Sequence, residues 1–114
     1  MIREIRHELR RIAEDAVPED CRVVVGSRQI DFKEREPTIY EFGLVVVVPK
    51  KPEEALDDFD GLIAGEGSIK ERLETDRTLG GRAADLSVRR IVGPSRAGEN
   101  ETLAEWVVNV LQED

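Results

Sequence analysis

Cysteine, histidine and aromatic residues are scarce in this chain of 114 residues, which holds one cysteine, one histidine and 4% aromatic residues. The single cysteine, Cys21, excludes a disulfide within the chain and fits a reducing compartment. The single histidine, His7, is linked by no motif to a serine or cysteine, so no catalytic nucleophile–base pair is predicted. The basic, aromatic-rich surface that binds single-stranded nucleic acids is also missing, because the only adjacent arginine pairs are Arg10-Arg11 and Arg89-Arg90.

Long hydrophobic runs and an excess of positive charge are absent as well. The longest apolar run, residues 44–48, is far shorter than the roughly 20 residues that cross a membrane. Charged residues among the first eight interrupt any apolar start, so no signal peptide is expected. The 25 acidic and 17 basic residues give a net charge of −8, which disfavours binding to phosphate backbones or anionic lipid. We therefore expect a soluble protein.

The composition that remains fits one folded domain over residues 1–114. Hydrophobic residues make up 39% of the chain and charged residues 37%, which predicts a modest core under a highly charged surface. A chain of this length is typical of a single domain.

The first half of the chain predicts one helix and two strands. Residues 1–16 carry apolar side chains at helical spacing, and Pro18 follows their end. Residues 21–25 form a short β-branched run that predicts a strand ending at Gly26. Residues 38–48 give the strongest strand, with its last half apolar on both faces. The charged segment 27–37 between these strands is interpreted as a long loop, with a short edge strand as the alternative.

The second half predicts two helices and a hairpin. Pro52 opens a helix that Gly65-Glu66-Gly67 ends, and Ser68 with Glu71 forms a capping box for a second, short helix. Gly80-Gly81 predicts a turn. Residues 85–92 and 102–111 read as strands that pair through a turn over residues 93–100. The order α-β-β-α-α-β-β predicts an α+β fold, with helices on one face of a mixed or antiparallel sheet.

The same periodicities predict the buried core. Ten side chains fall on the inward positions of the expected helices and strands: Ile5, Leu9, Ile12, Leu44, Val46, Phe59, Leu62, Leu73, Val88 and Val108.

No catalytic, cofactor-binding or metal site is predicted. His7 falls on the charged face of its helix and is interpreted as a solvated side chain, and Cys21 as a small core residue rather than a reactive thiol. Residues 65–68 lack the spacing of a phosphate-binding loop, and Glu66 would repel phosphate. Residues 58–61 resemble the middle of a calcium loop, but the acidic residues required at positions 56 and 67 are missing. We expect no enzymatic activity.

The segment Leu73–Gly81 followed by a hairpin resembles the tail-terminator (minor tail) proteins of long-tailed phages with non-contractile tails. In that family a helix ends in an Asp-x-Thr-Leu-Gly-Gly turn, and a stretch similar to Leu103–Val110 closes the chain. The order of elements resembles the family over most of the chain, whereas the amino-acid sequence itself resembles it only over residues 73–111. Arg77 stands where the family often has proline, and Arg82 where it often has an apolar residue.

This resemblance implies structural work in the virion, after assembly in the host cytoplasm. Such proteins form a homohexameric ring that caps the tail tube, ends its polymerisation and joins it to the head-completion (stopper) proteins, and DNA passes through the lumen. Six copies at −8 would carry about −48, a charge that discourages DNA from sticking. No cofactor is implied. We interpret five residues as candidate contacts with other subunits: Ile30, Phe32, Arg77, Arg82 and Trp106, with core burial as the alternative for Trp106.

Other functions remain open at this point. The chain could be a different part of the head–tail junction, such as a head-closure or tail-completion protein. It could also be a small cytosolic regulatory binding module. An enzyme is the least favoured class because no catalytic constellation can be assembled from the sequence.

Overall fold

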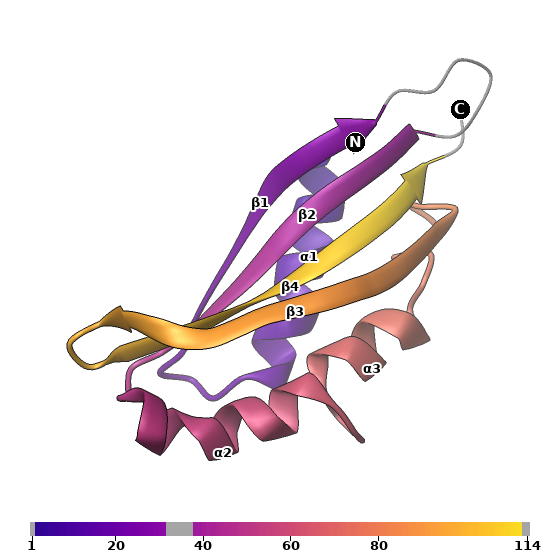
Figure 1. Cartoon of the computed structure of the whole chain (residues 1–114). Helices are drawn as coiled ribbons and strands as arrows, with labels where there is room; N and C mark the ends of the chain where they lie inside the picture. Colours follow the sequence, from indigo (N-terminus) through magenta and orange to yellow (C-terminus); the bar gives the residue numbers. More distant parts are fainter. Residues whose placement is uncertain (1, 32–37, 113–114) are drawn as a thin grey trace.

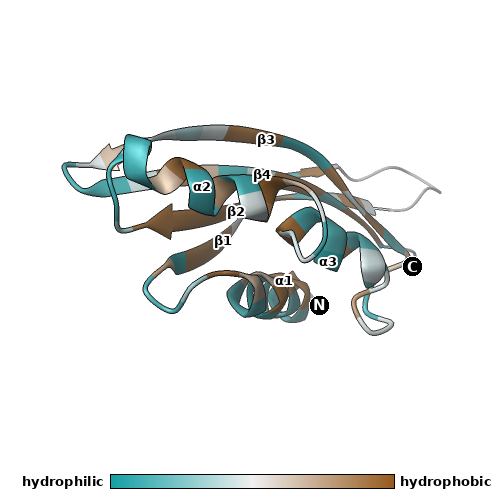
Figure 2. Ribbon diagram, turned by 90° about the horizontal axis from the view of Figure 1, so that it is seen from below, coloured by the Kyte–Doolittle hydropathy of each residue, from teal (hydrophilic) through white to brown (hydrophobic). Residues whose placement is uncertain are grey.

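Four antiparallel strands form one sheet in the order β1-β2-β4-β3, and three helices cover one of its faces (Figures 1 and 2). The computed structural model describes residues 2–31 and 38–112. The elements in chain order are α1 (Ile2–Ala16), β1 (Arg22–Asp31), β2 (Thr38–Val48), α2 (Pro52–Ile63), α3 (Ile69–Thr75), β3 (Asp85–Gly98) and β4 (Glu101–Gln112). The predicted α+β class and the order α-β-β-α-α-β-β are confirmed.

The core lies between the helices and the inward face of the two central strands. Along β2 and β4, alternate side chains point to this face, where Leu44 pairs with Trp106 and Phe42 with Val108. Helix α1 packs against β1, and α2 packs against β3 and β4. Nine of the ten predicted core residues are buried, and Val88 is half-buried and packs against the cluster.

Local signals in the sequence determine the helix ends. Pro52 occupies the first turn of α2, as predicted. At α3 the Ser68 hydroxyl oxygen accepts a hydrogen bond from the Glu71 amide at 3.1 Å. The Glu71 carboxylate accepts one from the amide of Gly67, at 2.9 Å, which is one residue before the usual position of a capping box.

The interpretation of residues 27–31 as a loop was wrong, and the edge-strand alternative holds for these residues. Strand β1 continues to Asp31, pairs with β2 as far as Ile39, and has a bulge between Ser27 and Gln29. Pairing to a long central strand provides backbone hydrogen bonds that the local charge pattern does not reveal.

The turn predicted over residues 93–100 was also placed too broadly. Strand β3 extends to Gly98, and only Glu99 and Asn100 form the turn. The β3–β4 pairing has three register shifts, and these irregularities accommodate within the strand residues that are typical of turns. Gly93 is one of them, with φ at 100°, where a Cβ would lie 3.0 Å from the Leu103 carbonyl oxygen.

None of the helices in the described part of the chain is both long and apolar enough to cross a membrane.

Candidate interface

The Asp-x-Thr-Leu-Gly-Gly segment forms a tight turn between α3 and β3. Leu79, Gly80 and Gly81 have φ values of 50°, 67° and 91° in succession, a region that glycine adopts without strain. The Asp76 carboxylate accepts a hydrogen bond from the Gly80 amide at 3.1 Å, and the Leu79 side chain is fully buried. Asp76, Leu79, Gly80 and Gly81 therefore each stabilise the turn or fit its backbone conformation.

The two arginines of this turn already have partners within the chain. Arg77 donates two hydrogen bonds to the carboxylate of Asp85, from Nε at 2.7 Å and from Nη2 at 2.9 Å. These bonds, and then a backbone hydrogen bond from Leu86, hold the pKa of the Asp85 carboxyl below its ordinary value. Arg82 donates to the Leu79 carbonyl oxygen at 3.2 Å. Both side chains remain exposed, so a contact with a second subunit stays a prediction.

Trp106 is a core residue, and its interpretation as an interface anchor was wrong. The side chain is fully buried on the helix-covered face of the sheet, opposite Leu44. Its indole Nε1 is enclosed without a hydrogen-bond partner in the described structure. The ring is therefore inaccessible to another subunit.

Ile30 and Phe32 belong to the charged segment 27–37, for which the sequence predicts a long loop. Ile30 is half-buried in β1 and pairs with Tyr40 on the helix-covered side of the sheet. Phe32 lies outside the described residues.

No helix of the described residues covers the face of the sheet opposite α1, α2 and α3, which we call the open face (Figure 2). Its central cross-strand pairs are Ile39–Leu111, Glu41–Asn109, Gly43–Val107, Val45–Glu105 and Val47–Leu103. On the two edge strands, Val24 is 58% exposed and Val92 is 48% exposed. The sequence signal for this face was the apolar second face of β2, whose last half is predicted to be buried. Val47 is buried and Val45 is half-buried, although none of the three helices covers this side of the sheet.

An ion pair crosses the open face above Gly43. The Glu105 carboxylate lies so close to Gly43 that a Cβ at this position would overlap it. From there it faces Arg28 on β1 at 3.7 Å. The missing side chain at Gly43 thus lets Glu105 lie flat on the sheet and connect the central strand to the edge.

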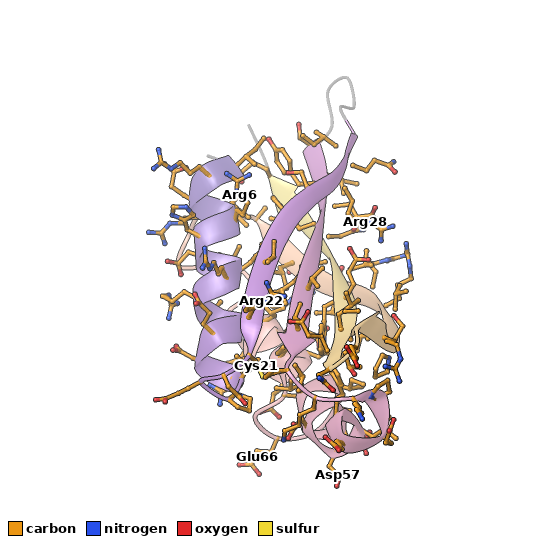
Figure 3. All side chains as sticks on the ribbon, turned by 90° about the vertical axis from the view of Figure 1, so that its left-hand side faces the viewer. Arg6, Cys21, Arg22, Arg28, Asp57 and Glu66 are labelled. Atoms are coloured by element: carbon orange, nitrogen blue, oxygen red, sulfur yellow. The ribbon has the colours of Figure 1, made fainter. Side chains whose placement is uncertain are left out.

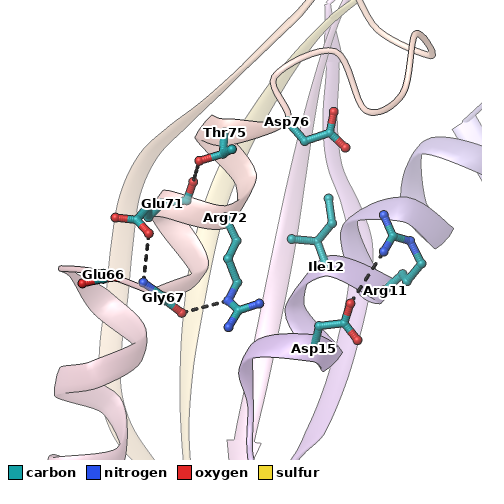
Figure 4. Close-up of a pocket in the computed structure, with 9 residues that line it drawn as sticks. All are labelled: Arg11, Ile12, Asp15, Glu66, Gly67, Glu71, Arg72, Thr75 and Asp76. Atoms are coloured by element: carbon teal, nitrogen blue, oxygen red, sulfur yellow. Dashed lines mark hydrogen bonds and ion pairs between the residues drawn. The ribbon is translucent and has the colours of Figure 1, made fainter.

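A groove of about 480 Å³ lies on the other side of the molecule, between α1 and α3 (Figure 4). Both of its arginines have partners within the chain. Arg11 forms an ion pair with Asp15 at 3.6 Å, and Arg72 donates to the Gly67 carbonyl oxygen at 2.9 Å. Two arginines and four carboxylates line the groove, a mixture that favours neither an anion nor an apolar ligand.

His7 is solvated, as the sequence predicts, whereas Cys21 is less buried than the core residue that the sequence predicts. His7 is exposed on α1, and Cys21 is half-buried against the edge of the core. Burial, followed by the charges of Asp20 and Asp58, raises the pKa of the Cys21 thiol to about 11. Among residues 2–31 and 38–112, no group of three or more His, Cys, Asp or Glu side chains is placed to hold a metal ion.

No protein-family model and no curated protein sequence matches this chain.

Proposed function

We propose that this chain is a structural assembly protein of a long-tailed phage, a tail terminator that forms a ring on the end of the tail tube. The observation that carries the proposal is the open face, which none of the three helices covers and on whose edge strands Val24 and Val92 are exposed. Its central pairs include the apolar Ile39–Leu111 and Val47–Leu103 beside the polar Glu41–Asn109 and Val45–Glu105. Exposed apolar side chains on an uncovered sheet face are typical of contacts with other subunits. The resemblance over residues 73–111 narrows the class of assembly to a tail terminator.

The turn and the charge of the chain support this narrower assignment. Asp76, Leu79, Gly80 and Gly81 each have a structural role in the turn that resembles the family. A net charge of −8 per copy would give a ring whose field repels DNA moving through its lumen. In this role the ring ends polymerisation of the tube and presents its other side to the head-completion proteins.

Mass measurement and electron microscopy test the proposal. We expect the purified protein to form particles of six 12.8-kDa copies, alone or on contact with tail tubes, and negative-stain images to show rings at tube ends. The double variant Val92→Asp with Leu103→Asp places two charges on the open face and should remain folded but fail to cap tubes. Ala64→Asp, an exposed site on the helix side, is the control and should cap normally.

A protein that stays monomeric and leaves tube ends bare would refute the proposal. Binding to a head-completion protein without any binding to tubes would instead favour the neighbouring role at the junction.

A further inference from the structure

Helix α2 presents a stripe of three carboxylates to solvent. Glu53, Asp57 and Asp60 follow one another at four and three residues, so they share one side of the helix. All three are exposed, and none forms an ion pair within the part of the chain that the structure describes. Leu56 lies beside them and is 50% exposed. We call these four residues the acidic stripe.

Helix α1 presents the opposite charge beside β1. Arg3, Arg6 and Arg10 follow one another at three and four residues, again on one side of a helix. Arg6 and Arg10, with His7, line a groove of about 190 Å³ whose other wall is the edge-strand segment 23–25. Arg10 also forms an exposed ion pair with Glu14 at 3.3 Å.

Val24 lies on the edge strand where this groove meets the open face, and it is 58% exposed. We call the three arginines and Val24 the basic groove. The three arginines match the three carboxylates of the acidic stripe in number and extent, because the first and last of each set lie seven positions apart, or about 10 Å along the helix.

One copy cannot bring these two surfaces together. Helix α1 packs against β1 and helix α2 against β3 and β4, the strands on opposite sides of the sheet. Figure 3 shows Arg6 beside β1 and Asp57 well apart from it on α2. Complementary charge and an exposed apolar side chain on each surface identify a second copy of this chain as the partner.

We propose that the acidic stripe of one copy docks in the basic groove of the next. This inference rests on the proposed function, since it names the contact between neighbouring subunits of the ring. The contact is heterologous, so each subunit keeps one stripe and one groove free for a further copy until the ring closes.

Charge reversal on each side tests the contact. One variant carries R3E, R6E and R10E, and the other carries E53K, D57K and D60K. Each alone brings like charges together, and we expect the protein concentration at half-assembly to rise at least about tenfold. An equimolar mixture of the two variants pairs opposite charges again and should assemble near the wild-type concentration into alternating rings. Analytical ultracentrifugation measures assembly, and circular dichroism checks that each variant folds.

The control is Glu66→Lys with Glu99→Lys, which shifts the net charge in the same direction as the second variant at exposed sites outside both surfaces. This control should assemble like the wild type. Folded reversal variants that assemble normally, or a mixture that fails to recover, would overturn the inference while wild-type rings still support the proposed function. Particles whose assembly depends on both surfaces, but which never cap tail tubes, would support the inference and refute the proposed function.

Discussion

At the scale of single residues, Cys21 shows how burial controls chemistry. Its thiol is half-buried beside two carboxylates, and the pKa is raised from 9.0 to about 11. Because the thiolate is the reactive form, a rise of this size lowers its population at pH 8 by about a hundredfold. We expect iodoacetamide to label the folded protein far more slowly than the same chain in urea. Equal rates in the two states would show that the thiol is not protected.

The Arg77–Asp85 ion pair predicts a dependence of stability on pH. The pKa of the Asp85 carboxyl is lowered from 3.8 in the folded chain, so the carboxylate form favours folding. This contribution is present above pH 3.8 and is lost as the pH falls through the lower, folded value. Arg77→Gln should therefore lower the urea midpoint at pH 7 and have a shrinking effect as the pH falls toward 2. A difference that does not change with pH would show that the arginine acts through packing alone.

At the scale of elements, the turn after α3 depends on two glycines with positive φ. Gly80→Ala or Gly81→Ala should cost about 1–2 kcal/mol of unfolding free energy, because a Cβ disfavours this backbone region. Gly61 provides a matched control, since it lies inside α2 with open space around the position of a Cβ. Gly61→Ala should stabilise the protein by about 0.5–1 kcal/mol. Urea denaturation measures all three variants.

The core between α1 and the sheet should contribute strongly to the stability of the fold. Leu9 on α1 and Leu44 on β2 are both fully buried. Leu9→Ala or Leu44→Ala should each cost about 2–5 kcal/mol, because each removes three carbons from a filled core. Leu56→Ala, on the exposed side of α2, should change the unfolding free energy of the monomer by less than about 0.5 kcal/mol. A loss under half a kcal/mol at both core positions would mean that the core is misplaced.

The elements differ in how far the sequence could predict them. The alternation along residues 38–48 and the proline at position 52 act locally, so β2 and α2 were found with their ends. The extent of β1 and of the hairpin depends on cross-strand pairing. This pairing tolerates Ser27 and Gly93 at bulges, although both residue types are typical of loops when the local sequence is considered alone.

The candidate interface was harder to predict than the fold. Trp106 shares a strand face with Ala104 and Val108, so period-two spacing already indicated burial, and its aromatic character was given too much weight. Val24 belongs to an apolar run whose exposure depends on which sheet face the helices leave bare. The stripes on α1 and α2 were present in the sequence, but their placement on opposite sides of the molecule required the strand order.

At the scale of the whole molecule, charge controls behaviour in solution. The sequence isoelectric point is about 4.8, so the repulsion that a net charge of −8 provides near pH 7 vanishes in mild acid. We expect light scattering to show the lowest solubility near pH 4.8 and recovery on either side. A minimum near neutral pH would indicate that specific contacts, rather than net charge, limit solubility.

The strand order also has a consequence for synthesis on the ribosome. Strand β4 follows the other six elements of the described residues in chain order, yet it lies inside the sheet between β2 and β3 (Figure 1). Until β4 emerges, β2 lacks its inner neighbour and β3 has no strand beside it, so the sheet cannot close. A chain that has not yet made β4 therefore lacks the complete sheet, and the open face with its central row of β4 residues cannot form.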